Sequence, residues 1–107
     1  LREAGAGALS VDVAQLAPQA WESVAVAVEA GVALWAGVVP TRGPVPEVGP
    51  VLDAVRRPWA RIGMPQSALA DVVLSPACGL AGASPAHARA VLARVVEAAG
   101  ALTEAAA

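Results

Sequence analysis

The sequence predicts an α/β fold in which a parallel sheet of three strands alternates with helices. Three apolar segments of strand length are each followed by a segment whose apolar residues recur every three or four positions. Residues 32–39 are apolar without alternation, which is typical of a parallel strand covered on both faces. Such an order of strands and helices requires right-handed crossovers, so we expect the strands to run parallel.

The first strand and its helix are predicted within residues 8–31. Residues 8–13, Ala-Leu-Ser-Val-Asp-Val, form the strand, and we interpret residues 1–5 as the last turn of an earlier helix. Pro18 suits the first turn of the following helix, and Gly31 ends that helix. Its inward face is expected to carry Trp21, Val24, Ala25 and Val28.

The second unit consists of the strand at residues 32–39, a loop rich in Pro and Gly at residues 40–46, and a helix. Pro58 falls inside the predicted helix and should kink it or end it early, because proline cannot donate the helical hydrogen bond. The apolar positions that predict this helix are Val48, Val51, Leu52, Val55, Trp59 and Ile62.

The third unit begins with a strand predicted at residues 71–74. Ser84 followed by Pro85 supplies an N-cap and a first helical residue for the last helix. The apolar stripe of that helix is expected to contain Ala88, Val91, Leu92, Val95, Ala99 and Leu102.

Length and composition exclude several classes of protein. A chain of 107 residues is one domain or a piece of one, and its net charge of −2, with Arg as its only basic residue type, provides no basic face for nucleic acid. The longest apolar run, residues 32–39, is too short to cross a membrane, and no basic-then-apolar signal pattern is present. One cysteine excludes an internal disulfide, so we expect a cytoplasmic protein.

The candidate functional residues lie at predicted strand ends. In a parallel α/β fold these ends share one face, where Asp12 with Gln15, residues 39–42 and residues 76–79 should converge. Asp12 offers a hard oxygen and Cys78 a soft thiolate, and zinc accepts both as ligands. We therefore predict Asp12 and Cys78 as metal ligands of an incomplete zinc site, since a catalytic zinc generally takes three protein ligands. No catalytic or cofactor-binding residue is predicted.

Each candidate also has a structural interpretation. An aspartate such as Asp12 more often binds local backbone N–H groups than a metal, and a single cysteine such as Cys78 often packs as a small core residue. His87 falls in the first turn of the last helix and is expected to face solvent. Residues 79–84 form either an anion site before a helix N-terminus or a tight turn. Trp35 supplies core volume or lines a pocket.

Two segments carry a resemblance to the cobalamin-independent methionine synthase family. Residues 75–80, Ser-Pro-Ala-Cys-Gly-Leu, resemble the Pro-Asp-Cys-Gly-Leu segment that bears that family's last zinc-binding cysteine. Residues 8–12 resemble the strand that ends in the family's zinc-binding carboxylate, with Asp12 in place of Glu. Residues 37–55 and 87–99 are similar to the intervening strand and helix and to the closing helix.

The resemblance implies a partial (β/α)8 (TIM) barrel in which residues 1–107 form about three C-terminal βα units. It also implies a fragment of a methyltransferase that makes methionine from homocysteine and a methyl donor. Zinc would bind the thiol of homocysteine and stabilise its thiolate, with Asp12 and Cys78 as two of the ligands. The histidine and cysteine that complete the family's site have no counterpart here, so we expect this fragment to be inactive alone.

Two departures and two alternatives accompany this interpretation. Ala77 stands where the family motif has Asp, and residues 39–42 lack the family's proton-donating histidine, which argues against methyltetrahydrofolate as the methyl donor.

One alternative function is a non-catalytic α/β module that associates with itself, and the other is a fragment of a uroporphyrinogen-decarboxylase-like barrel. Because three strands cannot close a barrel, we expect an exposed sheet edge and incompletely covered apolar faces.

Overall fold

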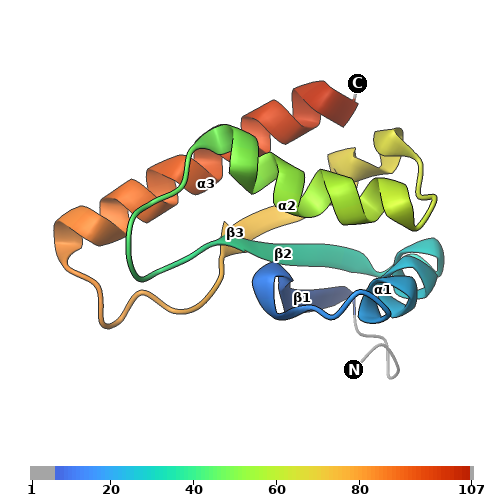
Figure 1. The fold of residues 1–107 in the computed structure, drawn as a ribbon, viewed down its shortest axis with the longest axis horizontal. Coiled ribbons are helices and arrows are strands. Elements are labelled where there is room, and N and C mark those ends of the chain that lie inside the picture. The colour runs from blue at the N-terminus through green and yellow to red at the C-terminus, as the bar shows by residue number, and fades with distance from the viewer. Residues whose placement is uncertain (1–6, 107) are drawn as a thin grey trace.

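The computed structural model describes residues 7–106 and contains one parallel sheet of three strands in the order β1-β2-β3 (Figure 1). The strands are β1 (Ala8–Asp12), β2 (Ala33–Val39) and β3 (Val73–Pro76). The helices are α1 (Ala20–Glu29), α2 (Val48–Arg61) and α3 (Pro85–Ala106), with short 3-10 helices η1 (Val13–Gln15) and η2 (Gln66–Asp71). The predicted alternation of parallel strands and helices is confirmed, and the helical turn predicted at residues 1–5 lies outside the described residues.

The helices cover one face of the sheet, and within residues 7–106 the other face is exposed at Trp35 of β2 and Val73 of β3, whereas Gly37 and Val39 of β2 are buried. Leu34, Ala36 and Val38 of β2 are buried, whereas Trp35 between them is 47% exposed. Val73, which pairs with Trp35 in the neighbouring strand, is 44% exposed. The expectation that residues 32–39 are covered on both faces is therefore wrong at Trp35, because right-handed crossovers between strands in sequential order place successive helices on the same side.

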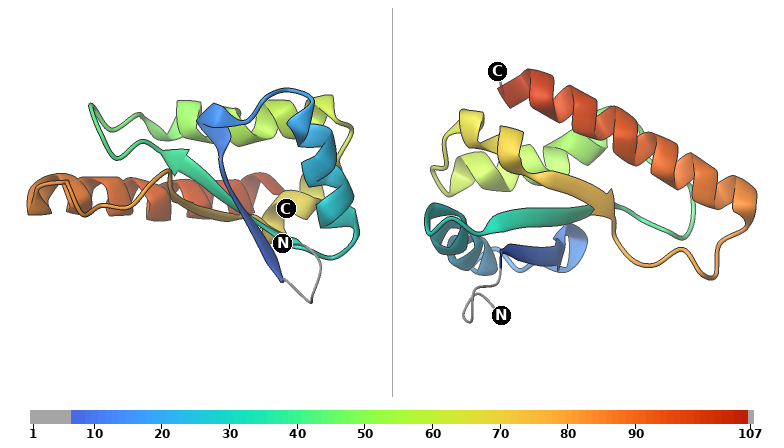
Figure 2. Two further views of the ribbon diagram at one scale, coloured as in Figure 1. Left: turned by 90° about the horizontal axis from the view of Figure 1, so that it is seen from below. Right: turned by 180° about the vertical axis from the view of Figure 1, so that it is seen from behind.

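The hydrophobic core lies between the covered face of the sheet and the three helices. Figure 2 shows the helices and the sheet from below and from behind. Its residues are Trp21, Val24, Leu34, Ala36, Val38, Val51, Val55, Trp59, Leu69, Leu74, Val91, Val95, Ala98, Leu102 and their neighbours. Two predicted inward positions differ: Ala27 rather than Ala25 is buried in α1, and Leu92 of α3 is 47% exposed. Leu92 lies one residue beyond Val91, so about 100° of helical rotation turns it away from the buried stripe.

Both outer strands have a free edge within residues 7–106. There β1 pairs only with β2, and β3 also pairs only with β2. The expected exposed edge and partly covered faces are thus confirmed. Over the same residues, no helix has both the length and the apolar character needed to cross a bilayer.

Helix α2 continues through Pro58 and ends at Arg61, so proline does not end it early. Tertiary contacts hold this last turn, because Trp59 is 1% exposed and its indole Nε1–H donates a hydrogen bond to the carbonyl oxygen of Pro65 at 2.9 Å. The unpredicted helix η2 follows, and it delays the start of β3 to Val73 instead of residue 71.

Gly37 lies where the backbones of three strands approach each other closely. A Cβ atom at this position would lie 2.9 Å from the Cα of Ala77 and 3.2 Å from the carbonyl oxygens of Pro76 and Val11. We expect Gly37→Ala to lower the free energy of unfolding by about 1–3 kcal/mol, because backbone atoms cannot move aside cheaply. The control is Gly49→Ala in α2, where a Cβ would meet nothing within 4 Å. Urea unfolding of both variants measures the difference, and equal stabilities would contradict the close approach.

Candidate functional site

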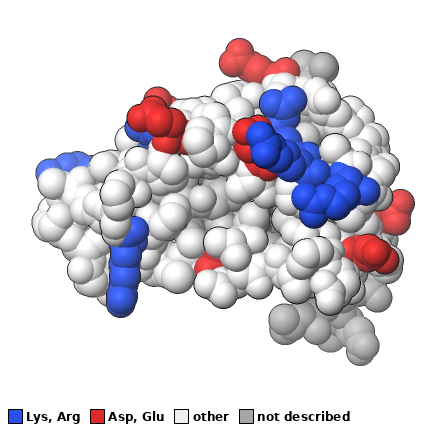
Figure 3. Space-filling model, viewed as in Figure 1, with Lys and Arg blue, Asp and Glu red and all other residues white. Residues whose placement is uncertain are grey.

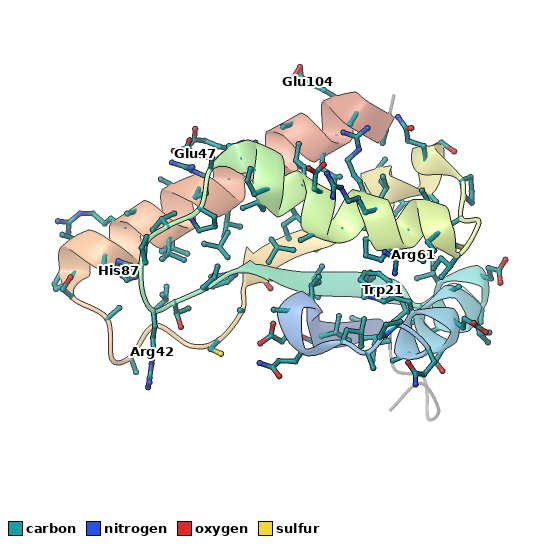
Figure 4. All side chains as sticks on the ribbon, viewed as in Figure 1. Trp21, Arg42, Glu47, Arg61, His87 and Glu104 are labelled. Carbon is teal, nitrogen blue, oxygen red and sulfur yellow. The ribbon has the colours of Figure 1, made fainter. Side chains whose placement is uncertain are left out.

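An open pocket of about 960 Å³ lies at the carboxyl ends of the three strands. It is formed by η1, the loop after β2, the loop after β3 and the first turn of α3. Its polar lining includes Asp12, Gln15, Thr41, Arg42, Cys78 and His87. Figure 4 shows His87 and Arg42 at the same end of the molecule, on α3 and on the loop after β2 respectively. The predicted convergence of Asp12 and Gln15 with residues 39–42 and residues 76–79 is confirmed.

Asp12 is the last residue of β1 and the N-cap of η1. Its Oδ1 accepts a hydrogen bond from the backbone N–H of Ala14 at 3.1 Å. The predicted structural role, binding a local N–H group, is therefore present, and it also fixes the orientation of the carboxylate beside the pocket. Within residues 7–106 this hydrogen bond to Oδ1 is the only one that the Asp12 side chain forms, and no ion pair involves it, so Oδ2 retains its capacity to bind a ligand.

Cys78 is a free thiol in the loop after β3, and it is exposed. The core interpretation of this cysteine is therefore wrong. The N–H of Ala77 donates to the carbonyl oxygen of Val39 at 2.9 Å, which extends the pairing of β2 and β3 past Pro76. The chain then leaves the sheet, so Cys78 lines the pocket instead of entering the core.

His87 joins the last helix to the loop after β2. Its Nε2 lies 3.1 Å from the carbonyl oxygen of Thr41, and its backbone N–H donates to Ser84 Oγ at 3.1 Å. The predicted Ser84 cap is thus confirmed, whereas the ring is half-buried and bonded instead of facing solvent. A carbonyl oxygen only accepts, so Nε2 is the donor in this hydrogen bond.

The rest of the pocket wall is a hydrogen-bonded turn and a loop anchored to α3. The N–H of Ala83 donates to the carbonyl oxygen of Leu80 at 3.0 Å, which is the tight turn considered for residues 79–84. Arg94 Nη1 donates to the carbonyl oxygen of Pro46 at 2.6 Å, and the same guanidinium lies 3.5 Å from Glu47 Oε2. Sequence reasoning missed the contacts of His87 with Thr41 and of Arg94 with Pro46, because these partners lie more than 40 residues away and no local pattern marks them.

The charged side chains of α2 lie away from this pocket. Basic side chains gather over α2 on the face seen in Figure 3. Arg57 is exposed and pairs with Asp53 at 3.4 Å, one helical turn earlier. With Arg56 they border a smaller pocket of about 280 Å³. This is the solvated face of a helix, and an exposed pair of this kind adds little to stability.

Asp12 and Cys78 suit zinc by chemical type, but they do not complete a zinc site. Over residues 7–106, no three His, Cys, Asp or Glu side chains come together as a group able to hold a metal ion. A zinc ion bound between Asp12 and Cys78 would need further ligands, from water or from residues outside this group.

Comparison with known proteins identifies no relative: no family model, no curated protein and no solved structure matches the chain.

Proposed function

We propose that this chain contributes Asp12 and Cys78 as zinc ligands to a methyltransferase that makes methionine from homocysteine. The observation that carries the proposal is the lining of one pocket by both residues, although they follow different strands and lie far apart in the sequence. The carboxyl ends of parallel strands are where α/β enzymes place their reactive groups. An oriented carboxylate and an exposed thiol at this edge are therefore suited to share one ion.

The fold supports a partial (β/α)8 barrel as the architecture. Three parallel strands in sequential order, with their helices on one face, repeat the unit from which such barrels are built. In a barrel, the bare face with Trp35 and Val73 would turn inward, and the free edges of β1 and β3 would pair with further strands.

The residues of the chain have separate roles in this proposal. Cys78 supplies an anionic sulfur, and Asp12 supplies an oxygen held in place by the N–H of Ala14. When bound, zinc would lower the pKa of a substrate thiol and so maintain a thiolate near neutral pH. His87 positions the loop after β2 through its hydrogen bond to Thr41, and this loop lines the same pocket as Cys78.

A second function, a non-catalytic module that associates with itself, is favoured by one further observation. Within residues 7–106, the sheet face exposed at Trp35 and the unpaired edges of β1 and β3 provide apolar surface and unpaired backbone groups. This alternative predicts association without any role for Cys78.

Cobalt(II) titration tests the proposed site, because cobalt replaces zinc and its bond to a thiolate absorbs in the near ultraviolet. We expect the 107-residue chain to bind cobalt weakly, with sulfur-to-metal absorption, because only two ligands are preformed. Cys78→Ser should remove the absorption, and Asp12→Asn should weaken binding while keeping it. Absence of the thiolate band in the unmodified chain would refute the site, and tight stoichiometric binding by a monomer would show that the ligands are wrongly assigned.

A further inference from the structure

Helix α3 carries exposed apolar side chains on its outer side. Val96 is 71% exposed and Leu92 is 47% exposed, one helical turn apart. The buried residues of α3 face the core: Val91, Val95, Ala98, Leu102 and Ala106. Figures 1 and 2 show α3 at the surface of the molecule, so its outer side is free to contact a partner.

Gly100 lies one turn after Val96 on the same outer side. A Cβ atom there would meet nothing within 4 Å, so no neighbour among the described residues requires glycine. Glycine is nevertheless the least favourable helical residue after proline. A glycine on an exposed helix face leaves a notch into which a side chain of a second helix fits closely.

Opposite charges flank this apolar surface. Arg89 lies about two turns before Val96, Glu104 lies about two turns after it, and both are exposed. The ion pairs formed within residues 7–106 join Arg57 to Asp53 and Arg94 to Glu47 and Glu97, and involve neither of these two residues. Arg89 and Glu104 are about 22 Å apart along the helix, which is too far for a pair within one chain.

We propose that two copies of this chain form a dimer through antiparallel α3 helices, with the two-fold axis at Val96. Val96 then contacts Val96 of the partner subunit, and Leu92 packs over the partner's Gly100. Arg89 meets the partner's Glu104, and symmetry forms the last two contacts twice. One arrangement thus pairs Val96 with itself, Leu92 with Gly100 and Arg89 with Glu104, so the surface is complementary to itself rather than to an unrelated partner.

This proposal does not depend on the metal site. It uses no residue of the pocket, and the bare sheet face with Trp35 is the competing surface for self-association. A single helix pair buries a small area, so we expect the dimer to be weak and its population to depend on protein concentration.

Charge reversal followed by sedimentation equilibrium tests the pairing, in buffer with a reducing agent so that Cys78 forms no disulfide. Arg89→Glu and Glu104→Arg should each raise the dimer Kd about tenfold, and the double variant should return it to within about threefold of the original value. Val96→Glu should raise Kd by at least about tenfold, because it places two like charges at the axis. Failure of the double variant to restore the dimer would overturn the proposal.

Gly100→Ala provides a second test, because its two expected effects have opposite signs. In dilute solution, the Tm of the monomer should rise by a few degrees, since alanine is the better helix former. At high concentration the dimer should weaken, because the added methyl group fills the notch that receives Leu92. A variant that is more stable and dimerises equally well would refute the proposed contact. The proposed dimer would also be refuted if the unmodified chain stays monomeric at millimolar concentration. It would likewise be refuted if Trp35→Ser abolishes the dimer and Val96→Glu does not.

Discussion

Cys78→Ser is expected to lower methyl transfer to homocysteine by at least about 100-fold in a protein that joins this chain to the remaining zinc ligands. Loss of a group that only orients a ligand already weakens metal binding by about 10- to 100-fold, so loss of a thiolate ligand should cost more. Zinc content should fall together with activity. Asp12→Asn should weaken metal retention less, because the amide still offers an oxygen.

Thermal stability separates this effect from a loss of folding. Because Cys78 is exposed, serine at this position should change the free energy of unfolding by no more than about 0.5 kcal/mol. Zinc content, thermal unfolding and thiol methylation are measured on the same preparation. A serine variant that keeps both its zinc and its activity would refute the enzymatic proposal and leave the non-catalytic module as the better explanation.

Trp59→Ala is expected to lower the free energy of unfolding by about 3–5 kcal/mol, a large part of the total stability of a small domain. The side chain is 1% exposed, and its removal leaves a large cavity between α2 and the sheet. Trp59→Phe keeps most of the volume but leaves the carbonyl oxygen of Pro65 without its donor, at a cost of about 1–3 kcal/mol.

Trp35→Ala is the matched control, because the same side chain is removed from the bare face of the sheet. Trp35 is 47% exposed, so the cost should stay near 1 kcal/mol. Urea unfolding followed by far-ultraviolet circular dichroism measures all three variants without relying on tryptophan fluorescence. Equal losses for Trp35→Ala and Trp59→Ala would mean that another surface covers the sheet face in solution.

Local patterns predicted the helices and strands best where the spacing of apolar residues agreed with residues that mark the ends of helices or strands. Ser84 and Pro85 mark the start of α3 correctly, and the apolar run at residues 32–39 corresponds to β2 within one residue. The prediction was weaker around Pro58, because burial of Trp59 keeps the helix intact through the proline. The helix η2 has no clear periodicity, so β3 was placed two residues too early.

The candidate site was predictable only as a set of converging strand ends. Asp12 and Cys78 were identified from their positions after apolar runs, and both line the pocket. The partners of His87 and Arg94 were not predictable, because contacts between a loop and a distant helix depend on how the elements pack. Exposure of Cys78 likewise follows from the path of the chain after Pro76.

By itself, the sequence determined the alternation of parallel strands and helices and the edge of the sheet at which polar residues gather. These properties follow from periodicity and from the handedness of crossovers, which act over short stretches of chain. Only the tertiary structure decided which sheet face is bare, which side of α3 is exposed and which loops meet at the pocket. Those outcomes depend on contacts between distant residues, whose energies are set by three-dimensional packing rather than by local sequence.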